Sequence, residues 1–106
     1  MIRHIVMLAV PPRHDAAKLA EVMHGLSDLR DAMPGFTDFE HGPNRDFEGK
    51  SSQFPYGFIC TFADAAAVAA YAADSRHQAL GAQLVALCCG GADGIQVVDI
   101  EIGVPQ

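Results

Sequence analysis

The chain has 106 residues, of which 50% are hydrophobic, and it carries a formal net charge of −6. This length predicts a single domain over residues 1–106 that is large enough to form a real core. The acidic excess argues against binding to nucleic acid or to anionic membranes, because both partners require a basic surface that neutralises phosphate groups.

The first ten residues, MIRHIVMLAV, predict a β-strand over about Ile2 to Val10, which Pro11 and Pro12 end. This segment is too short to cross a bilayer, and it lacks the small-residue cleavage site of a signal peptide. We therefore expect a cytoplasmic protein. The three cysteines have no CxxC spacing, which is consistent with reduced thiols in that compartment.

A helix and two strands are predicted next. Asp15 can cap a helix whose apolar residues recur at helical spacing until the proline and glycine of MPGF end it. These apolar residues are Leu19, Val22, Met23, Leu26, Leu29 and Met33. A strand is expected over about Phe36 to Gly42, then the polar loop GPNRDFEGKSSQ. Aromatic and β-favouring residues predict another strand over about Tyr56 to Phe62.

The second half of the chain predicts two helices and a last strand. Asp64 can cap an alanine-rich helix that runs through Tyr71. Ser75 and Gln78 have the spacing of a capping box, so a further helix is expected from Ser75 to about Cys88. GGADG ends that helix, and IQVVDIEI predicts the last strand. The resulting order, βαββαβ, predicts a ferredoxin-like α+β fold with an antiparallel sheet covered by helices on one face.

Both faces of this sheet are apolar. In the first strand, Ile2, Val6 and Leu8 share one face with His4, and the opposite face carries Arg3, Ile5, Met7 and Ala9. The last strand likewise has Ile95 and Val97 on one face and Val98, Ile100 and Ile102 on the other. Because helices cover only one face, the simplest cover for the second is the sheet of another copy. We therefore predict a homodimer whose sheets pack face to face as a dimeric α+β barrel.

Several segments resemble the stress-responsive dimeric α/β-barrel (Dabb) proteins. MIRHIVMLAV is similar to their first strand, MPGF to their helix terminator, and HGPNRDFEGKSS to their loop with glycine, asparagine and EGKS. YGFICTFADAAAVAAYAADSRHQAL is similar to their strand, helix and histidine segment. Where this family often has His-Pro-x-His, the present chain has DSRH, which keeps only the last histidine, His77. Ser75 is expected to supply an N-cap in place of the missing proline.

The resemblance implies a set of site residues but not one activity. In cyclase-type relatives, a histidine of the first strand, a tyrosine of the second helix and the following histidine line one pocket. These residues fall on His4, Tyr71 and His77, and a further histidine of those enzymes falls on Tyr56. Many members of the family are known only as folds, a few are polyketide cyclases, and similar barrels host cofactor-less monooxygenases and lactone isomerases, so the fold alone does not choose an activity.

The residue types themselves fit proton abstraction next to a carbonyl group. His77 lies in the first turn of its helix, where the helix dipole disfavours the imidazolium and leaves a neutral base. Tyr71 could stabilise a forming enolate through its hydroxyl group. A structural interpretation is also open for each residue: His77 could bond a backbone carbonyl at the helix terminus, His4 could be a core histidine, and Tyr71 could be a core aromatic.

We expect a small apolar pocket between sheet and helices, with Val6, Leu8, Tyr56 and Phe58 as ligand-binding walls beside His4, Tyr71 and His77. Three functions are considered: binding of a small apolar molecule, a cofactor-independent cyclase or isomerase that acts on a carbonyl compound, and a structural role with the pocket filled by side chains. No metal or cofactor is expected, because the histidines form no HxH or HExxH motif. The remaining histidines are expected at the surface: His14, His24 and His41.

Overall fold

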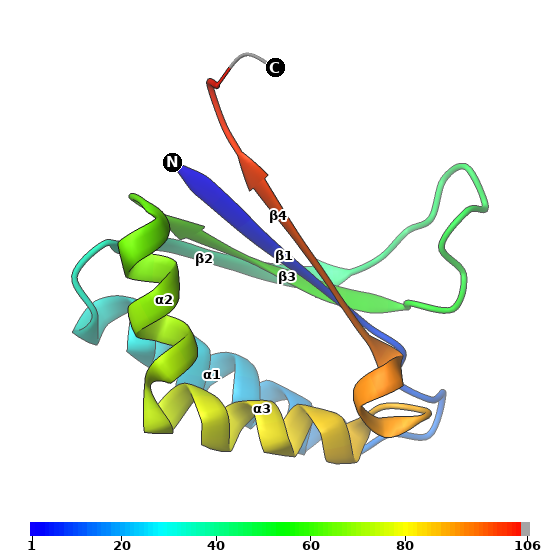
Figure 1. Cartoon of the computed structure of the whole chain (residues 1–106). Coiled ribbons are helices and arrows are strands. Elements are labelled where there is room, and N and C mark those ends of the chain that lie inside the picture. Colours follow the sequence, from blue (N-terminus) through cyan, green and yellow to red (C-terminus); the bar gives the residue numbers. More distant parts are fainter. Residues whose placement is uncertain (105–106) are drawn as a thin grey trace.

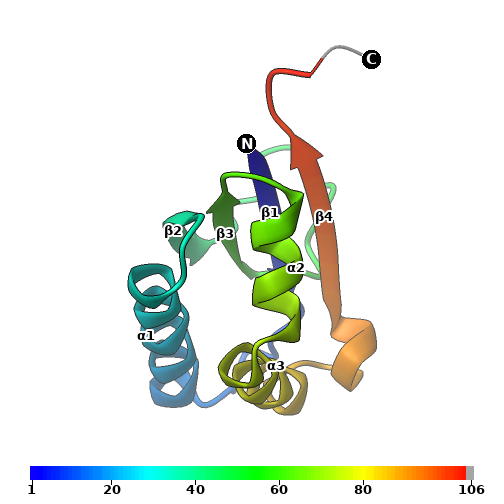
Figure 2. The same ribbon diagram turned by 60° about the vertical axis from the view of Figure 1, so that its left-hand side comes forward.

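The computed structural model describes residues 1–104 and has the predicted order of elements (Figure 1). The strands are β1 (Ile2–Leu8), β2 (Phe36–Pro43), β3 (Tyr56–Phe62) and β4 (Ile95–Glu101). The helices are α1 (Ala16–Ala32), α2 (Ala65–Ala73), α3 (Ser75–Leu87) and the short 3-10 helix η1 (Gly91–Gly94). The strands form one antiparallel sheet in the order β2-β3-β1-β4, with α1, α2 and α3 on one face (Figures 1 and 2). The predicted ferredoxin-like α+β fold is confirmed.

Side-chain caps begin two of the helices where the sequence predicts them. The Asp15 carboxylate accepts a hydrogen bond from the backbone N–H of Lys18 at 3.0 Å, and the Asp64 carboxylate accepts one from Ala67 at 2.9 Å. The turn between α1 and β2 depends on Gly35, whose φ of 83° is left-handed. A Cβ atom there would lie 2.7 Å from the Cβ of Ala67, so the turn excludes a side chain.

The start of α3 differs from the prediction, because Asp74 and not Ser75 is the N-cap. The Asp74 carboxylate accepts the backbone N–H of Arg76 at 2.8 Å and also two hydrogen bonds from its guanidinium group, at 2.8 and 3.0 Å. Hydrogen bonds to Arg76 lower the pKa of Asp74 to about 2. A carboxylate is as good a cap as a hydroxyl group, and this one also binds a cation, so Asp74 becomes the cap while the helix begins at Ser75 as predicted.

Two boundaries are shifted by one or two residues. β1 ends at Leu8 instead of Val10, because the next residue, Ala9, bonds outside the strand ladders, to Gly94 and Cys89 at 2.8 Å each. α2 continues to Ala73, past the predicted end at Tyr71. The two helices α2 and α3 are therefore separated only by Asp74, where the chain leaves helical geometry with a ψ of 130°.

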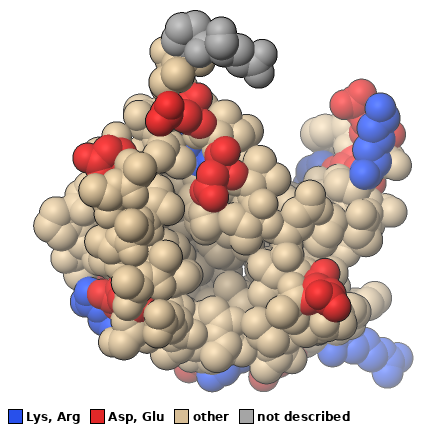
Figure 3. All heavy atoms as spheres, in the orientation of Figure 1, with Lys and Arg blue, Asp and Glu red and all other residues tan. Residues whose placement is uncertain are grey.

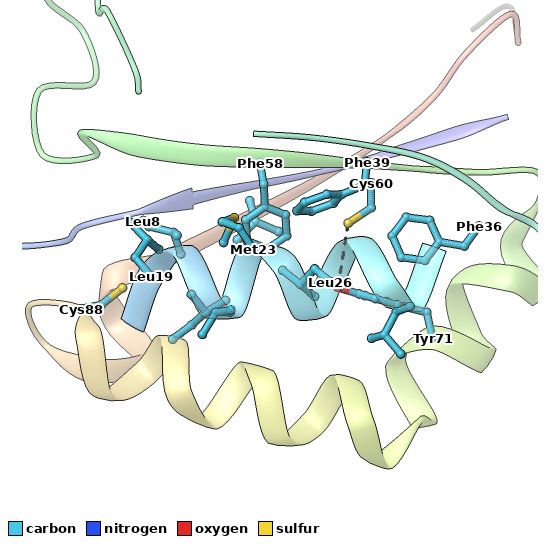
Figure 4. Close-up of a cluster of buried hydrophobic side chains, with 14 of the residues drawn as sticks. Leu8, Leu19, Met23, Leu26, Phe36, Phe39, Phe58, Cys60, Tyr71 and Cys88 are labelled. Carbon is cyan, nitrogen blue, oxygen red and sulfur yellow. Dashed lines mark hydrogen bonds between the residues drawn. The ribbon is translucent and has the colours of Figure 1, made fainter. Parts of the chain in front are cut away.

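The core lies between the sheet and the helices (Figure 4). Each buried side chain stabilises the fold by roughly 1.5–3 kcal/mol. The strands contribute Val6, Leu8, Phe36, Phe39, Phe58, Cys60 and Phe62, and α1 contributes Leu19, Val22, Met23, Leu26 and Leu29. At one end, the rings of Phe36, Phe62 and Tyr71 pack together, with centroids 4.7 to 5.4 Å apart.

The other face of the sheet carries no helix (Figure 2). On β4 it exposes Val98 and Ile100, which are 41% and 46% exposed, and Ile102, just after the strand, is 42% exposed. Ile5 pairs with both Val98 and Ile59 across the sheet, so these residues share one face. We call this surface, formed by Ile5, Met7, Ile59, Val98 and Ile100, the open face. Its apolar character agrees with the alternation predicted from the sequence.

Candidate functional site

The structure brings together His4, Tyr71 and His77, which come from β1, α2 and α3. The ring centroids of His4 and Tyr71 are 5.8 Å apart, and those of Tyr71 and His77 are 3.9 Å apart. Tyr71 therefore lies between the two imidazoles in one cluster of ionisable side chains. The three elements that hold these residues meet at the end of the core where the aromatic rings pack.

A carboxylate orients His4. In the sheet His4 is paired with Asp99 of β4, and Nδ1 of His4 lies 2.7 Å from Oδ1 of Asp99. Because a carboxylate only accepts, Nδ1 carries the proton, and Nε2 of the neutral ring is left with a lone pair. The His4 side chain is 14% exposed, and that of Asp99 is 49% exposed. The pair thus combines a fixed tautomer with access to solvent.

The sequence reasoning missed Asp99. It lies on the same face of β4 as Ile95, Val97 and Glu101, so it is the first carboxylate after two apolar residues on the helix-facing side. That departure from the pattern was the available signal, because in the predicted βαββαβ arrangement the first and last strands are neighbours. Together with a strand register, it would have placed the carboxylate opposite His4.

Tyr71 is buried and keeps its proton at neutral pH. Its side chain is 2% exposed, and the thiol of Cys60 donates a weak hydrogen bond to its oxygen, with a sulfur–oxygen distance of 3.9 Å (Figure 4). Burial raises the pKa of Tyr71 well above its usual value and raises the pKa of Cys60 to about 12. The Tyr71 hydroxyl therefore points into the core, between Cys60 and Leu26 (Figure 4).

His77 is half-buried and electrically neutral at pH 7. Burial lowers its pKa below the usual value of 6.5, and the neighbouring His4 lowers it further. Its Nδ1 is buried and makes no well-aligned hydrogen bond within residues 1–104, although the backbone of Ala72 and Tyr71 lies close to the ring and opposes part of the pKa shift. An uncharged imidazole that stacks on a phenol is thereby placed beside the His4–Asp99 pair.

A depression opens beside this cluster. Val97 faces the same side of β4 as Asp99 but is 49% exposed, because the helix layer does not reach it. Figure 3 shows the surface hollowed where α2, α3 and β4 come together. We call this depression the β4 hollow. We assign Val97, Asp99 and His4 to its border, because Val97 and Asp99 are half-exposed on the helix-facing side and His4 is bonded to Asp99. The hollow has an apolar wall and one oriented imidazole.

The four residues predicted to form ligand-binding walls are placed elsewhere. Val6, Leu8 and Phe58 are buried in the core. In Figure 4, Leu8 lies beside Leu19 and Phe58 beside Met23, away from Tyr71. Tyr56 lies on β3 four residues before Cys60, the residue paired with His4, so it is roughly 13 Å along the strand from the cluster. Its hydroxyl group bonds to Nδ1 of His41 instead.

Residues 1–104 contain neither a cluster of metal-ligating side chains nor a membrane-spanning helix. In this part of the chain, no three histidine, cysteine, aspartate or glutamate side chains are grouped closely enough to hold a metal ion. None of the helices in the same range combines the length and apolar character needed to span a membrane.

Comparison with known proteins gives a family and several structural neighbours. The family model described as the stress responsive A/B barrel domain (Dabb) matches residues 2–102. A dimeric ferredoxin-like protein of unknown function from Jannaschia sp. CCS1 is 50% identical, with a TM-score of 0.90 over 95% of this chain and 98% of that one. Among curated protein sequences, none matches this chain.

Two neighbours with a described activity are more distant. The hydroxynitrile lyase of Passiflora edulis is 15% identical, with a TM-score of 0.77 over 98% of this chain and 96% of that one. SnoaB, a cofactor-independent oxygenase of Streptomyces nogalater, is also 15% identical, with a TM-score of 0.73 over 98% of this chain and 94% of that one. At these identities the likeness shows a shared fold and no shared activity.

Proposed function

Because the chain belongs to the stress-responsive A/B barrel (Dabb) domain family, we propose that it is a homodimer that binds a small, mostly apolar, carbonyl-containing molecule in the β4 hollow. The observation that carries this proposal is the His4–Asp99 pair at the edge of an apolar depression. A histidine that only filled the core would not need a tautomer fixed by a half-exposed carboxylate. An apolar site with a few oriented polar groups is typical of small-molecule binding.

Self-association is supported by the open face. It exposes several large aliphatic side chains on one side of the sheet, and a patch of this kind on a small domain marks an interaction surface. The 50% identical protein from Jannaschia is described as dimeric. Packing the open faces of two copies together would cover these side chains and complete the barrel expected from the sequence.

Ligand binding can be tested with acetophenone, a small aryl ketone, and NMR spectroscopy of the dimer. We expect its titration to shift the ring signals of His4 and the methyl signals of Val97. Val97→Trp should fill the β4 hollow and abolish these shifts, whereas Glu21→Trp, on the exposed surface of α1, should leave them intact. If Val97→Trp binds acetophenone as the wild type does, the ligand does not occupy this hollow. If neither protein binds it or related ketones, the structural role is favoured.

A second candidate, a cofactor-independent cyclase or isomerase, is favoured by the same hydrogen bond. With Nδ1 of His4 held by Asp99, Nε2 can take a proton from the carbon next to a carbonyl group. The electron pair then moves to the carbonyl oxygen to give an enolate, while the proton is held on His4. The Tyr71 hydroxyl is buried against Cys60 of β3 and does not face this oxygen. His77, neutral beside Tyr71, is the second base in the cluster.

This chemistry has a simple assay that requires no natural substrate. In D2O, an enzyme of this kind should speed the exchange of the acetophenone methyl hydrogens for deuterium, as followed by proton NMR. His4→Ala should abolish the acceleration, whereas His24→Ala, at an exposed position on α1, should not. Binding of acetophenone without accelerated exchange would leave the binding function and remove the catalytic one.

A further inference from the structure

A second cavity lies at the other end of the sheet, where the residues after β1 meet the loop before β3. Its volume is about 760 Å³, and its walls include Pro11, Pro12, Pro43 and Pro55, for which we call it the proline cavity. Ligand pockets in proteins have volumes of about 300–1,000 Å³. Its lining includes none of the residues of the His4 cluster, and Tyr56, expected in that cluster, lines the proline cavity instead.

The walls of the proline cavity are held in place before any ligand arrives. Backbone hydrogen bonds tie Ala9 to both Gly94 and Cys89 at 2.8 Å, and Asn44 to Pro55 at 2.9 Å. The prolines add rigidity because their rings fix φ. A preformed site loses little conformational entropy on binding, which favours the binding of a small molecule.

The lining chemistry selects an uncharged ligand. No aspartate, glutamate, lysine or arginine lines the proline cavity, so a charged molecule would lose its hydration without gaining a counter-charge. The prolines also lack backbone N–H groups and present mainly C–H surface. The partly negative face of an aromatic ring packs favourably on such a surface. The ligand best suited to these walls is therefore neutral and aromatic.

The polar side chains in the lining are His14, Ser52, Gln53 and Tyr56, and His14 is the one whose tautomer the structure fixes. Its Nδ1 lies 2.7 Å from the carbonyl oxygen of Pro11. Because a carbonyl oxygen only accepts, Nδ1 must carry the proton, and Nε2 on the other edge of the neutral ring is an acceptor. We propose that the proline cavity binds a neutral aromatic molecule with a hydroxyl or N–H donor, of the phenol or indole class, whose hydrogen bond His14 accepts.

Cys89 gives this proposal a built-in reporter, because it lines the proline cavity and is exposed. The other two cysteines, Cys60 and Cys88, are buried, and burial raises the pKa of both thiols. Alkylation of the full-length protein by iodoacetamide, mapped by mass spectrometry, should therefore occur first at Cys89. We expect phenol to slow this alkylation in a saturable way, by roughly fivefold, because a bound ring covers the wall.

Benzoate, which has the same ring but a negative charge, should not slow the alkylation of Cys89. Protection by benzoate equal to that by phenol, or no protection by phenol, would overturn the proposal. The proline cavity is also separable from the β4 hollow: His4→Ala should leave protection by phenol unchanged. Loss of phenol protection in His4→Ala would mean that phenol acts through the hollow, whereas failure of acetophenone to bind would leave the phenol result standing.

The role of His14 has its own test. In the wild type, half-maximal protection of Cys89 should require a phenol concentration about fivefold lower than the toluene concentration. Toluene lacks the donor, and about fivefold is the effect expected for one neutral hydrogen bond. His14→Phe should remove this preference and keep the protection by toluene, and the exposed-site control His24→Phe should retain both. Equal protection by phenol and toluene in the wild type would overturn the hydrogen bond to His14 without requiring any variant to fold.

Discussion

His4 and Asp99 lie 95 positions apart in the chain, and Nδ1 of the histidine is 2.7 Å from Oδ1 of the aspartate. The pairing of β1 with β4 creates this contact, because it places the two residues opposite each other on the helix-facing side of the sheet. Both proposed activities of the β4 hollow depend on the tautomer that this contact selects.

Asp99→Asn should release that tautomer. An asparagine side chain can donate as well as accept, so it permits a proton on either nitrogen of His4. Nitrogen NMR of the imidazole should show a single tautomer in the wild type and a mixture in the variant. Exchange of acetophenone hydrogens, where the wild type accelerates it, should fall by roughly fivefold or more, the value of one hydrogen bond.

The control for this variant is Asp28→Asn, on the exposed surface of α1. It should leave both the nitrogen spectrum of His4 and the exchange rate unchanged. An unaltered His4 tautomer in Asp99→Asn would contradict the assignment of Asp99 as the orienting group.

Two substitutions of Tyr71 separate the contribution of its ring to stability from that of its hydroxyl group. Tyr71→Ala should lower the free energy of unfolding by about 3–5 kcal/mol, because it leaves a cavity among packed aromatic rings. Tyr71→Phe keeps the ring and removes only a hydroxyl group whose partner in the described structure is a thiol at 3.9 Å. We expect it to change the free energy by less than about 1 kcal/mol. Urea unfolding measures both, and an equal loss in the two variants would contradict this division.

Stability should depend on pH through His77. Burial lowers the pKa of His77 in the folded state, so the unfolded chain holds more protons just below pH 6.5. Stability then rises with pH across the window between the lowered pKa and 6.5 and falls when the solution is acidified through it. His77→Phe should flatten this part of the profile.

The measurement is the urea midpoint between about pH 5 and pH 8, the range in which histidines titrate. His24→Phe serves as the control, because His24 is largely exposed and should leave the slope unchanged. A slope in His77→Phe that matches the wild type would show that other groups carry the pH dependence.

The two faces of β4 offer a test of the dimer with neighbouring residues. Val98 lies on the open face and Val97 on the helix-facing side, and both are more than 40% exposed. Val98→Asp should weaken self-association by several kcal/mol, because it buries an unpaired charge between two apolar sheets. Val97→Asp should leave association intact. Sedimentation equilibrium distinguishes the two variants. Dissociation of Val97→Asp but not of Val98→Asp would show that the interface lies on the helix-facing side and not on the open face.

Much of this molecule follows from local patterns. The helical and alternating spacing of apolar residues gave the elements, and the apolar residues on both sides of the first and last strands indicated the open face. Family resemblance, in contrast, supplied His4, Tyr71 and His77 as a group. Their contact in the structure required long-range packing that spacing alone does not encode.

The features that the sequence did not predict depend on strand register and on which of two neighbouring residues caps a helix. Asp99 meets His4 only once the pairing of β1 with β4 is fixed, and Tyr56 leaves the cluster because β3 places it four residues away from the partner of His4. At the α3 terminus, two adjacent residues could each cap the helix, and the outcome was decided by the extra hydrogen bonds that Arg76 gives to Asp74. The proline cavity forms between loops that have no periodic pattern at all.

The single non-helical residue between α2 and α3 explains how Tyr71 and His77 can touch. Residues six apart on an uninterrupted helix are separated by about 9 Å along its axis and point in different directions. At Asp74 the backbone turns a corner, and the two rings come to lie 3.9 Å apart. If α2 and α3 formed one continuous helix, the rings of Tyr71 and His77 would move apart, although no side chain of the cluster had changed.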